Sequence, residues 1–143
     1  MTLVLRPATP DDLPVLHEIE RQSFSHQRWQ AKDFLADECF VAEIDGRVVG
    51  FLVSRQICGE RGEASEREIL NIAVAPHWRR KGTARALLMR ELQRKSVLYL
   101  EVRESNEAAQ RLYRALGFVE IGRRPEYYQE PREGAIVMQM KKC

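Results

Sequence analysis

The most informative segment of the chain reads Val74-Ala75-Pro76-His77-Trp78-Arg79-Arg80-Lys81-Gly82-Thr83-Ala84. An apolar run at 68–74 leads into it, and an apolar stripe with helical spacing follows it to about Lys95. This order predicts a strand that ends in a basic loop and enters a helix at Gly82. Backbone N–H groups at a helix start are unpaired and favour anions, so the loop suits a pyrophosphate. The alternative is a solvated basic turn before an ordinary helix, and spacing alone does not decide between them.

Two well-known phosphate-binding motifs do not fit this loop. The order Lys81-Gly82-Thr83 is the reverse of the Walker A order, and no glycine lies at the upstream position that this motif requires. The dinucleotide-binding fingerprint needs three glycines, and the segment has only Gly82. The loop therefore belongs to neither class.

Strand and helix signals alternate along the rest of the chain. Strands are expected at 3–7, 68–74, 97–102, 118–122 and 135–141, a hairpin at 40–57 around Asp45-Gly46, helices from Thr9 through Glu20, at 30–37, 82–95 and 107–116, and a loop at 59–67. This order predicts an α/β fold with at least one right-handed crossover, in a single domain over residues 1–143.

Composition excludes several classes of protein. The chain has 143 residues, 44% of them apolar, and a net charge of +2, which argues against disorder and against a strongly basic nucleic-acid binder. It contains neither a long apolar span nor a signal peptide, so we expect a cytoplasmic protein that binds no membrane. Its three cysteines (Cys39, Cys58, Cys143) and three histidines (His17, His26, His77) are scattered, which indicates neither disulfides nor a metal site.

Several segments occur together in an order that is typical of one superfamily. Arg79-x-x-Gly82-x-Ala84 resembles the acyl-CoA pyrophosphate loop of the GNAT acetyltransferases. Leu100-Glu101-Val102-Arg103, Ser105-Asn106 and Leu112-Tyr113-x-x-Leu116-Gly117-Phe118 resemble the second signature of that superfamily. Asn71–Val74, Arg123-Arg124, Tyr127-Tyr128 and Ala135–Met138 resemble its bacterial ribosomal-protein-alanine N-acetyltransferases. The resemblance covers essentially the whole chain.

The resemblance implies a GNAT fold: a mixed central sheet, flanked by helices, whose central strands splay apart near Val74 and Val102. It implies acetyl-CoA as co-substrate, no metal, and a protein N-terminus as acceptor, namely the N-terminal alanine of a small-subunit ribosomal protein. It also implies a monomer or weak dimer without direct nucleic-acid binding. The alternatives are a relative that acetylates lysine or a small-molecule amine, and a non-catalytic acyl-CoA-binding module, since a fold does not fix its substrate.

The same resemblance assigns the coenzyme-binding residues. Main-chain groups of Ile72, Ala73 and Val74 are expected to bond the pantetheine arm like an added strand, and an N–H near Val74 to stabilise the oxyanion. The loop residues Arg79, Arg80, Lys81, Gly82, Thr83 and Ala84 are expected around the phosphates. Asn106 either caps its helix, touches the coenzyme, or does both.

Two residues are candidates for proton transfer. Glu101 interrupts an apolar strand, where desolvation raises the pKa of a carboxylate toward that of a useful base. Its alternative role is an outward ion pair with Arg103 or another arginine. Tyr113 follows on the next helix, and its phenol is the implied proton donor to the coenzyme sulfur, whereas most helical tyrosines only pack. The resemblance favours the catalytic role for both.

The acceptor side departs from the resembled pattern. Arg28-Trp29 stands where a Pro-Trp pair is common, and Gly134 stands where an acidic residue is common. Ala84 replaces a glycine but is still small. Tyr127-Tyr128 either close over a peptide or simply pack, and Trp29 is either a core anchor or a wall of the peptide site. These departures concern the substrate more than the reaction.

Overall fold

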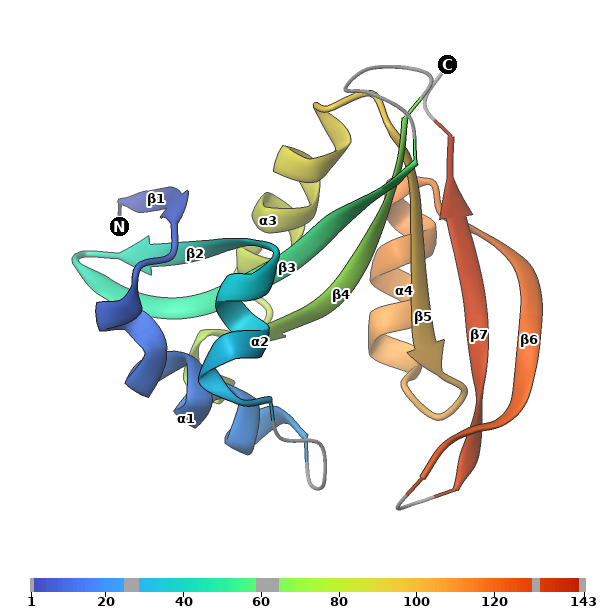
Figure 1. Ribbon diagram of the computed structural model, residues 1–143, viewed down its shortest axis with the longest axis horizontal. Coiled ribbons are helices and arrows are strands. Elements are labelled where there is room, and N and C mark those ends of the chain that lie inside the picture. The colour runs from blue at the N-terminus through green and yellow to red at the C-terminus, as the bar shows by residue number, and fades with distance from the viewer. Residues whose placement is uncertain (1, 25–28, 59–64, 130–131, 142–143) are drawn as a thin grey trace. The chain divides into compact units, whose positions relative to one another are not determined.

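The computed structural model describes residues 2–24, 29–58, 65–129 and 132–141 (Figure 1). Its elements alternate along the chain much as the sequence predicts. In order they are β1 (Leu3–Pro7), a 3-10 turn (Pro10–Asp12), α1 (Leu13–Ser23), α2 (Ala31–Ala36), β2 (Glu38–Ile44), β3 (Arg47–Cys58), β4 (Glu66–Val74), a second 3-10 turn (Pro76–Trp78), α3 (Thr83–Leu92), β5 (Val97–Arg103), α4 (Glu107–Leu116), β6 (Val119–Tyr128) and β7 (Glu133–Met140).

The strands form one seven-stranded sheet in the order β1-β2-β3-β4-β5-β7-β6. β4 and β5 pair in parallel, whereas β1–β2, β2–β3, β5–β7 and β6–β7 pair antiparallel. Because α3 lies between β4 and β5 in the chain, it provides the crossover that a parallel pair requires. This mixed sheet with its helices confirms the predicted α/β class.

The parallel ladder between β4 and β5 is short. Its register covers Glu66–Glu68 of β4 and Val97–Tyr99 of β5. β4 nevertheless continues to Val74 and β5 to Arg103, and β5 pairs with β7 along its other edge. A pairing that is confined to the beginning of both strands agrees with the splayed central pair that the resemblance implies.

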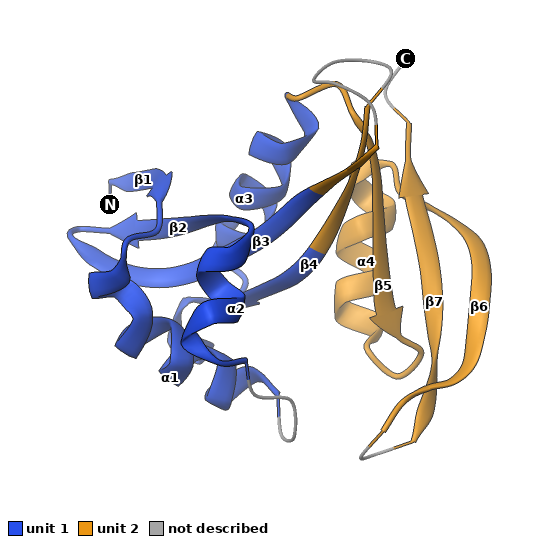
Figure 2. Ribbon diagram, viewed as in Figure 1, with its two compact units in different colours: residues 1–55, 70–93 blue, residues 56–69, 94–143 orange. Residues whose placement is uncertain are grey.

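The chain consists of two compact units (Figure 2). The first unit comprises Met1–Arg55 and Leu70–Gln93, and the second comprises Gln56–Ile69 and Arg94–Cys143. The first unit therefore contains α1, α2, α3 and the end of β4, and the second contains α4 and the C-terminal strands. β3 and β4 each contribute to both units.

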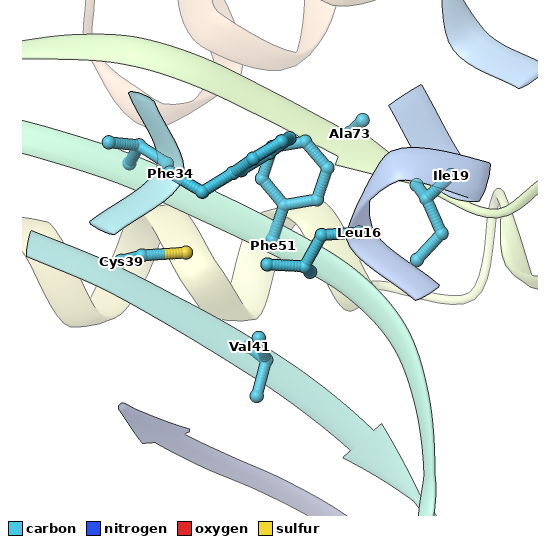
Figure 3. Packing of buried hydrophobic residues seen from close by; sticks show 8 residues of the cluster. Leu16, Ile19, Phe34, Cys39, Val41, Phe51 and Ala73 are labelled. Atoms are coloured by element: carbon cyan, nitrogen blue, oxygen red, sulfur yellow. The ribbon is translucent and has the colours of Figure 1, made fainter. Parts of the chain in front are cut away.

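The first unit is built around an apolar cluster that α1 and α2 form with the sheet (Figure 3). Its fully or almost fully buried members are Leu16, Ile19, Phe34, Cys39, Val41, Phe51, Val53 and Ala73. The Phe34 ring of α2 stands edge-on over the Phe51 ring of β3, with centroids 5.3 Å apart. Asp45 and Gly46 take positive φ angles of 51° and 81°, as a tight hairpin turn requires, which confirms the predicted hairpin.

In the second unit, β5 alternates strictly between two environments. Leu98, Leu100 and Val102 are buried, whereas Tyr99, Glu101 and Arg103 are half-buried on the opposite face. Asn106 is the N-cap of α4, and its side chain accepts a hydrogen bond from the Ala109 amide at 3.2 Å. Gly117 is the C-cap, with a φ of 108°. The capping role predicted for Asn106 is confirmed.

Several strand boundaries differ from the sequence prediction by one or two residues, and the end of β6 differs by more. β4 begins at Glu66, so the predicted loop at 59–67 ends earlier, and residues 59–64 of that loop lie outside the described part of the chain. β6 continues to Tyr128 instead of ending at Gly122. Its sequence contains Pro125, which suggests a break. However, β6 lies at the sheet edge, where a missing N–H is tolerated, and a register shift accommodates the irregular residues.

None of the described helices is long and apolar enough to cross a membrane. Two cysteine thiols in the described ranges are free, with Cys39 buried and Cys58 exposed. Cys143, His26 and Arg28, which the sequence analysis considered, lie outside the described residues.

Candidate active site

The basic loop of the first unit enters α3 through glycine in a left-handed conformation. Gly82 is the N-cap of α3 with a φ of 84°, and a Cβ added to it would meet no atom within 4 Å apart from its chain neighbours. The first helical hydrogen bond runs from the Ala86 N–H to the Gly82 carbonyl at 2.9 Å. The N–H groups of the three residues between them therefore have no partner within the helix. The start of α3 therefore offers backbone N–H donors next to the open space beside Gly82.

Arg79 uses its side chain to fasten the end of β4. Its Nε donates to the Val74 carbonyl at 2.9 Å, and its Nη2 donates to the Ser23 Oγ at 3.1 Å. The next peptide is held as well, because the Ala75 N–H donates to the Val49 carbonyl at 2.8 Å. Arg79, Arg80 and Lys81 are all exposed, and the Arg79 side chain fixes the strand that precedes the loop.

The side chains at the end of β4 are buried or half-buried, so mainly main-chain groups can contact a ligand there. Ala73 and Val74 are buried at 7% and 8% exposure, and Ile72 is half-buried. Thr83, the first residue of α3, is also buried, while Ala84 is half-buried. The structure places these residues together with the loop in the first unit. Their coenzyme contacts stay a prediction.

Glu101 lies on the polar face of β5 in the second unit. Its side chain is 15% exposed, and its Oε2 lies 3.6 Å from the Nε of Arg124. Among the described residues, this buried Oε2 has no hydrogen-bond partner. The outward arginine pair that the sequence left open therefore exists, with Arg124 rather than Arg103. This ion pair coexists with partial burial, and the paired Oε2 accepts no hydrogen bond from the described residues.

The surroundings of Glu101 act on its pKa in opposite directions. Burial raises the pKa above its usual range, and the negative charge of Glu68 adds to this effect. The Arg124 guanidinium and the Tyr127 hydroxyl lower it by favouring the ionised form. The net shift is upward, so the carboxylate is a stronger base than an ordinary surface glutamate.

Tyr113 lies on α4 and is largely buried, with 7% exposure. Its ring packs against that of Phe118, with centroids 5.8 Å apart. Burial raises the pKa of Tyr113 to about 12, so its hydroxyl stays protonated at neutral pH. The ring therefore packs as an ordinary helical tyrosine does. Its role as a proton donor stays a prediction.

Tyr127 and Tyr128 form a packed pair at the end of β6. Their rings meet edge to face with centroids 5.1 Å apart, and the Arg103 guanidinium lies 4.3 Å from the centroid of the Tyr128 ring. Arg103 also donates to Glu133 Oε1 at 3.0 Å. Tyr127 remains 48% exposed. Packing thus accounts for Tyr128, whereas Tyr127 presents an open surface near Glu101.

A family model described as the acetyltransferase (GNAT) family matches residues 6–118 of the chain. This chain belongs to the GNAT acetyltransferase family. It is accordingly an N-acetyltransferase of the GNAT type, as the resemblance of its motifs indicates.

Among known proteins, this GNAT acetyltransferase is similar to the [ribosomal protein bS18]-alanine N-acetyltransferase of Escherichia coli strain K12. The two are 35% identical over 139 residues, which cover 89% of each chain. The crystal structure of the ribosomal-protein-S18-alanine N-acetyltransferase from Escherichia coli superposes with a TM-score of 0.84 at 30% identity, covering 99% of this chain and 96% of that one. Ard1 from Thermoplasma volcanium superposes with a TM-score of 0.83 at 27% identity over 97% of both chains.

One departure of this GNAT acetyltransferase from the resembled pattern has a local explanation. A Cβ at Gly134 would lie 2.5 Å from Glu104 Oε1 and 3.2 Å from the Arg124 carbonyl. The Glu104 carboxylate thus occupies the space that a side chain at position 134 would need. An acidic residue at Gly134 requires Glu104 to move.

Sequence reasoning did not single out Arg124 as the partner of Glu101 in this GNAT acetyltransferase. Arg124 pairs with Ala135 of β7, and Ala135 pairs with Arg103 of β5, so Arg124 shares the polar face with Glu101. Predicting this pair from the sequence would require the register between β6 and β7, which two irregularities shift. Without that register, Arg124 is simply one of two adjacent arginines.

Proposed function

We propose that this GNAT acetyltransferase transfers an acetyl group from acetyl-CoA to the N-terminal α-amine of a protein, and that its acceptor is the N-terminal alanine of a small-subunit ribosomal protein. The similarity to the Escherichia coli enzyme over 89% of the chain supports this acceptor. One observation in the structure carries the chemistry: Glu101 is a partly buried carboxylate with an oxygen that lacks a hydrogen-bond partner within the described ranges. We further propose that residues 1–143 form one catalytic domain that works in the cytoplasm, where ribosomal proteins are made.

The first unit supplies coenzyme binding through its main chain. Backbone groups of Ile72, Ala73 and Val74 bond the pantetheine arm, and N–H groups from Arg79 to Ala84 bind the pyrophosphate. The Val74 N–H stabilises the oxyanion that forms on the thioester carbonyl. The Arg79 side chain supports this arrangement by holding the Val74 carbonyl. Asn106 of the second unit adds a contact to the coenzyme beside its capping role.

The second unit supplies the base. The amine nitrogen attacks the thioester carbonyl carbon, its surplus proton passes to Glu101 directly or through a water molecule, and the C–S bond breaks. A raised pKa improves Glu101 as a proton acceptor. No acyl-enzyme forms, because the amine attacks acetyl-CoA directly.

Tyr113 assists the departing sulfur. Burial raises the pKa of Tyr113 above that of an ordinary thiol, so complete transfer of its proton to a thiolate is unfavourable. A hydrogen bond from the hydroxyl stabilises the developing negative charge without that cost. We therefore assign Tyr113 the role of hydrogen-bond donor to the sulfur, with the final proton arriving from solvent or from Glu101.

The chemistry of the base favours a terminal amine over lysine. An α-amine has a pKa of about 8 and a lysine amine one of about 10.4, so the neutral nucleophile is more accessible for the terminus by roughly two orders of magnitude. A single carboxylate with a raised pKa, such as Glu101, is a suitable base for the amine that loses its proton more easily. Trp29 is proposed as a wall for the incoming peptide, and the exposed ring of Tyr127 is proposed as a separate contact to the acceptor.

A panel of acceptors tests this function directly. The purified protein with acetyl-CoA is offered peptides that begin with free alanine, with free methionine, and with a blocked terminus followed by an internal lysine, together with small amines. Acetylation is followed by mass spectrometry. Preference for the free-alanine peptide supports the proposal. Turnover confined to lysine or to small amines overturns the acceptor, and acetyl-CoA binding without turnover on any acceptor favours a non-catalytic binding module.

A further inference from the structure

Glu20 is a buried carboxylate that the chemistry above does not use. It lies near the end of α1 with 1% of its surface exposed. Its Oε1 accepts a hydrogen bond from the Trp29 backbone N–H at 2.7 Å, and its Oε2 accepts one from the Asn71 side-chain amide at 3.1 Å. Its two oxygens thus accept hydrogen bonds from two different segments, one just before α2 and one in β4.

A carboxylate that is almost completely buried is unfavourable unless it makes specific interactions. Burial of a charge is costly unless hydrogen bonds compensate for it, and an apolar residue would fill the same space without that cost. Hydrogen bonds to a charged acceptor are shorter and stronger than neutral ones, so two of them can hold two segments firmly. The carboxylate is suited to joining the two donors rather than to filling the core.

The two segments that Glu20 joins have different proposed tasks. Asn71 immediately precedes Ile72–Val74, the part of β4 that we assign to the coenzyme. Trp29 leads into α2, and its ring packs on Phe34 with centroids 5.3 Å apart. Ser23, one turn beyond Glu20 on α1, is the acceptor for Arg79, so the same helix end has a second connection to the coenzyme loop.

We propose that Glu20 is a positioning residue that couples coenzyme binding to the acceptor wall at Trp29. Acetyl-CoA bound along β4 steadies Asn71, Asn71 steadies the Glu20 carboxylate, and the carboxylate holds the Trp29 backbone in place for the peptide. The inference rests on the proposed function for the identities of coenzyme and acceptor. It predicts that the wall at Trp29 is ordered more firmly when acetyl-CoA is present.

In the hydrogen bond between Asn71 and Glu20, the donor and the acceptor can be exchanged by mutation. Asn71→Asp places a second carboxylate against Glu20, so the two repel and the connection breaks. Glu20→Gln in the Asn71→Asp background restores it, because the glutamine amide donates to Asp while its carbonyl still accepts from the Trp29 N–H. Glu20→Gln alone also retains both bonds once the Asn71 amide rotates and offers its oxygen. Glu91→Gln is the matched control, because Glu91 is a buried carboxylate of the same unit that accepts from Ser54 at 2.9 Å.

The experiment measures amide hydrogen exchange at Trp29 by NMR, with and without saturating acetyl-CoA, and KM and kcat for the free-alanine peptide. In the wild type we expect acetyl-CoA to slow exchange at Trp29 about tenfold. In Asn71→Asp we expect faster exchange, no response to acetyl-CoA, and a peptide KM about tenfold higher with kcat changed less than threefold. The double variant and Glu91→Gln should behave like the wild type.

The outcomes separate the inference from the function on which it rests. If Asn71→Asp keeps the acetyl-CoA response at Trp29, or if the double variant fails to recover it while still binding acetyl-CoA, the coupling role of Glu20 is wrong. If the wild type binds acetyl-CoA and shows the response at Trp29 but does not acetylate the peptide, the coupling stands and the proposed acceptor falls. If the wild type does not bind acetyl-CoA at all, the proposed function is overturned, and the coupling with it.

Discussion

Glu20 in the first unit and Glu101 in the second are both carboxylates withdrawn from water, and they differ in how their oxygens are used. Both oxygens of Glu20 accept hydrogen bonds, and its side chain is almost completely buried. Glu101 has a side chain that is 15% exposed and an Oε2 without a hydrogen-bond partner in the described part of the chain. A carboxylate whose oxygens both accept hydrogen bonds holds structure, whereas one with an oxygen that accepts no hydrogen bond can receive a proton from a substrate. The predictions below test this contrast.

The largest effect is expected at Glu101. Glu101→Gln removes the proton acceptor while keeping the shape of the side chain, so kcat should fall about 100-fold. Acetyl-CoA should still raise the unfolding temperature as in the wild type, because Glu101 is not among the residues assigned to coenzyme binding. Steady-state kinetics and thermal unfolding measure the two quantities. Full turnover in this variant, or an equal loss in Glu20→Gln, would break the contrast between the two carboxylates.

The backbone-based site of the first unit is tested at Gly82. Gly82→Asn places a side chain in the open space beside the loop while tolerating the left-handed φ of 84°. We expect it to weaken acetyl-CoA binding roughly 30-fold, as the loss of about 2 kcal/mol of phosphate contacts implies. Gly82→Val obstructs the same space and also strains the backbone, so it alone should lower the unfolding temperature of the ligand-free protein. Unchanged affinity in both variants, measured by calorimetry, would show that the loop does not bind the coenzyme.

A smaller effect is expected at Tyr113. Tyr113→Phe removes one hydrogen bond to the sulfur and retains the packing against Phe118, so kcat should fall about tenfold. The coenzyme affinity should not change. The loss of rate should be smaller with an acetyl thioester that has a better leaving group, because the departing sulfur then needs less stabilisation of its negative charge. Single-turnover kinetics measures this difference. If the rate falls equally with acetyl-CoA and with the thioester analogue, Tyr113 has a packing role only.

The smallest effect concerns pH. Arg124 lowers the pKa of Glu101, so Arg124→Gln should let that pKa rise further. Activity requires the ionised carboxylate and is lost on acidification, so the acid limb of kcat/KM should move to higher pH. Arg123→Gln is the matched control, because Arg123 pairs with Glu120 at 2.9 Å and not with Glu101. A displacement of the limb in the control, or none in Arg124→Gln, contradicts the assignment.

Sequence reasoning located most of the fold because local signals and tertiary structure agree. The Asp45-Gly46 turn, the Asn106 cap and the glycine end of α4 at Gly117 are set by nearby residues, so they are legible without the structure. These are also features that the structure confirms. The apolar run at 97–102 predicts a buried strand, whereas β5 alternates and holds Glu101 on a half-buried face.

The parts that could not be predicted depend on long-range register. β6 contains Pro125 and a positive φ of 54° at Glu126, both of which normally indicate a break. The strand nevertheless continues to Tyr128, because its pairing with β7 resumes after a register shift. The roles of Arg124 and Glu20 depend on contacts between segments that are far apart in sequence. No periodicity signals such contacts.

The position of β6 at the sheet edge has an evolutionary consequence. β6 is hydrogen-bonded along one side to β7 and is the last strand in the sheet order, so substitutions, bulges and prolines in it disturb fewer neighbours than they would in a central strand. The residues of β6 that surround Glu101 can therefore drift while the coenzyme loop stays constant. Selection for a new acceptor could act on this strand first, and enzymes that share one acetyl donor could diverge in their acceptors with little cost to folding.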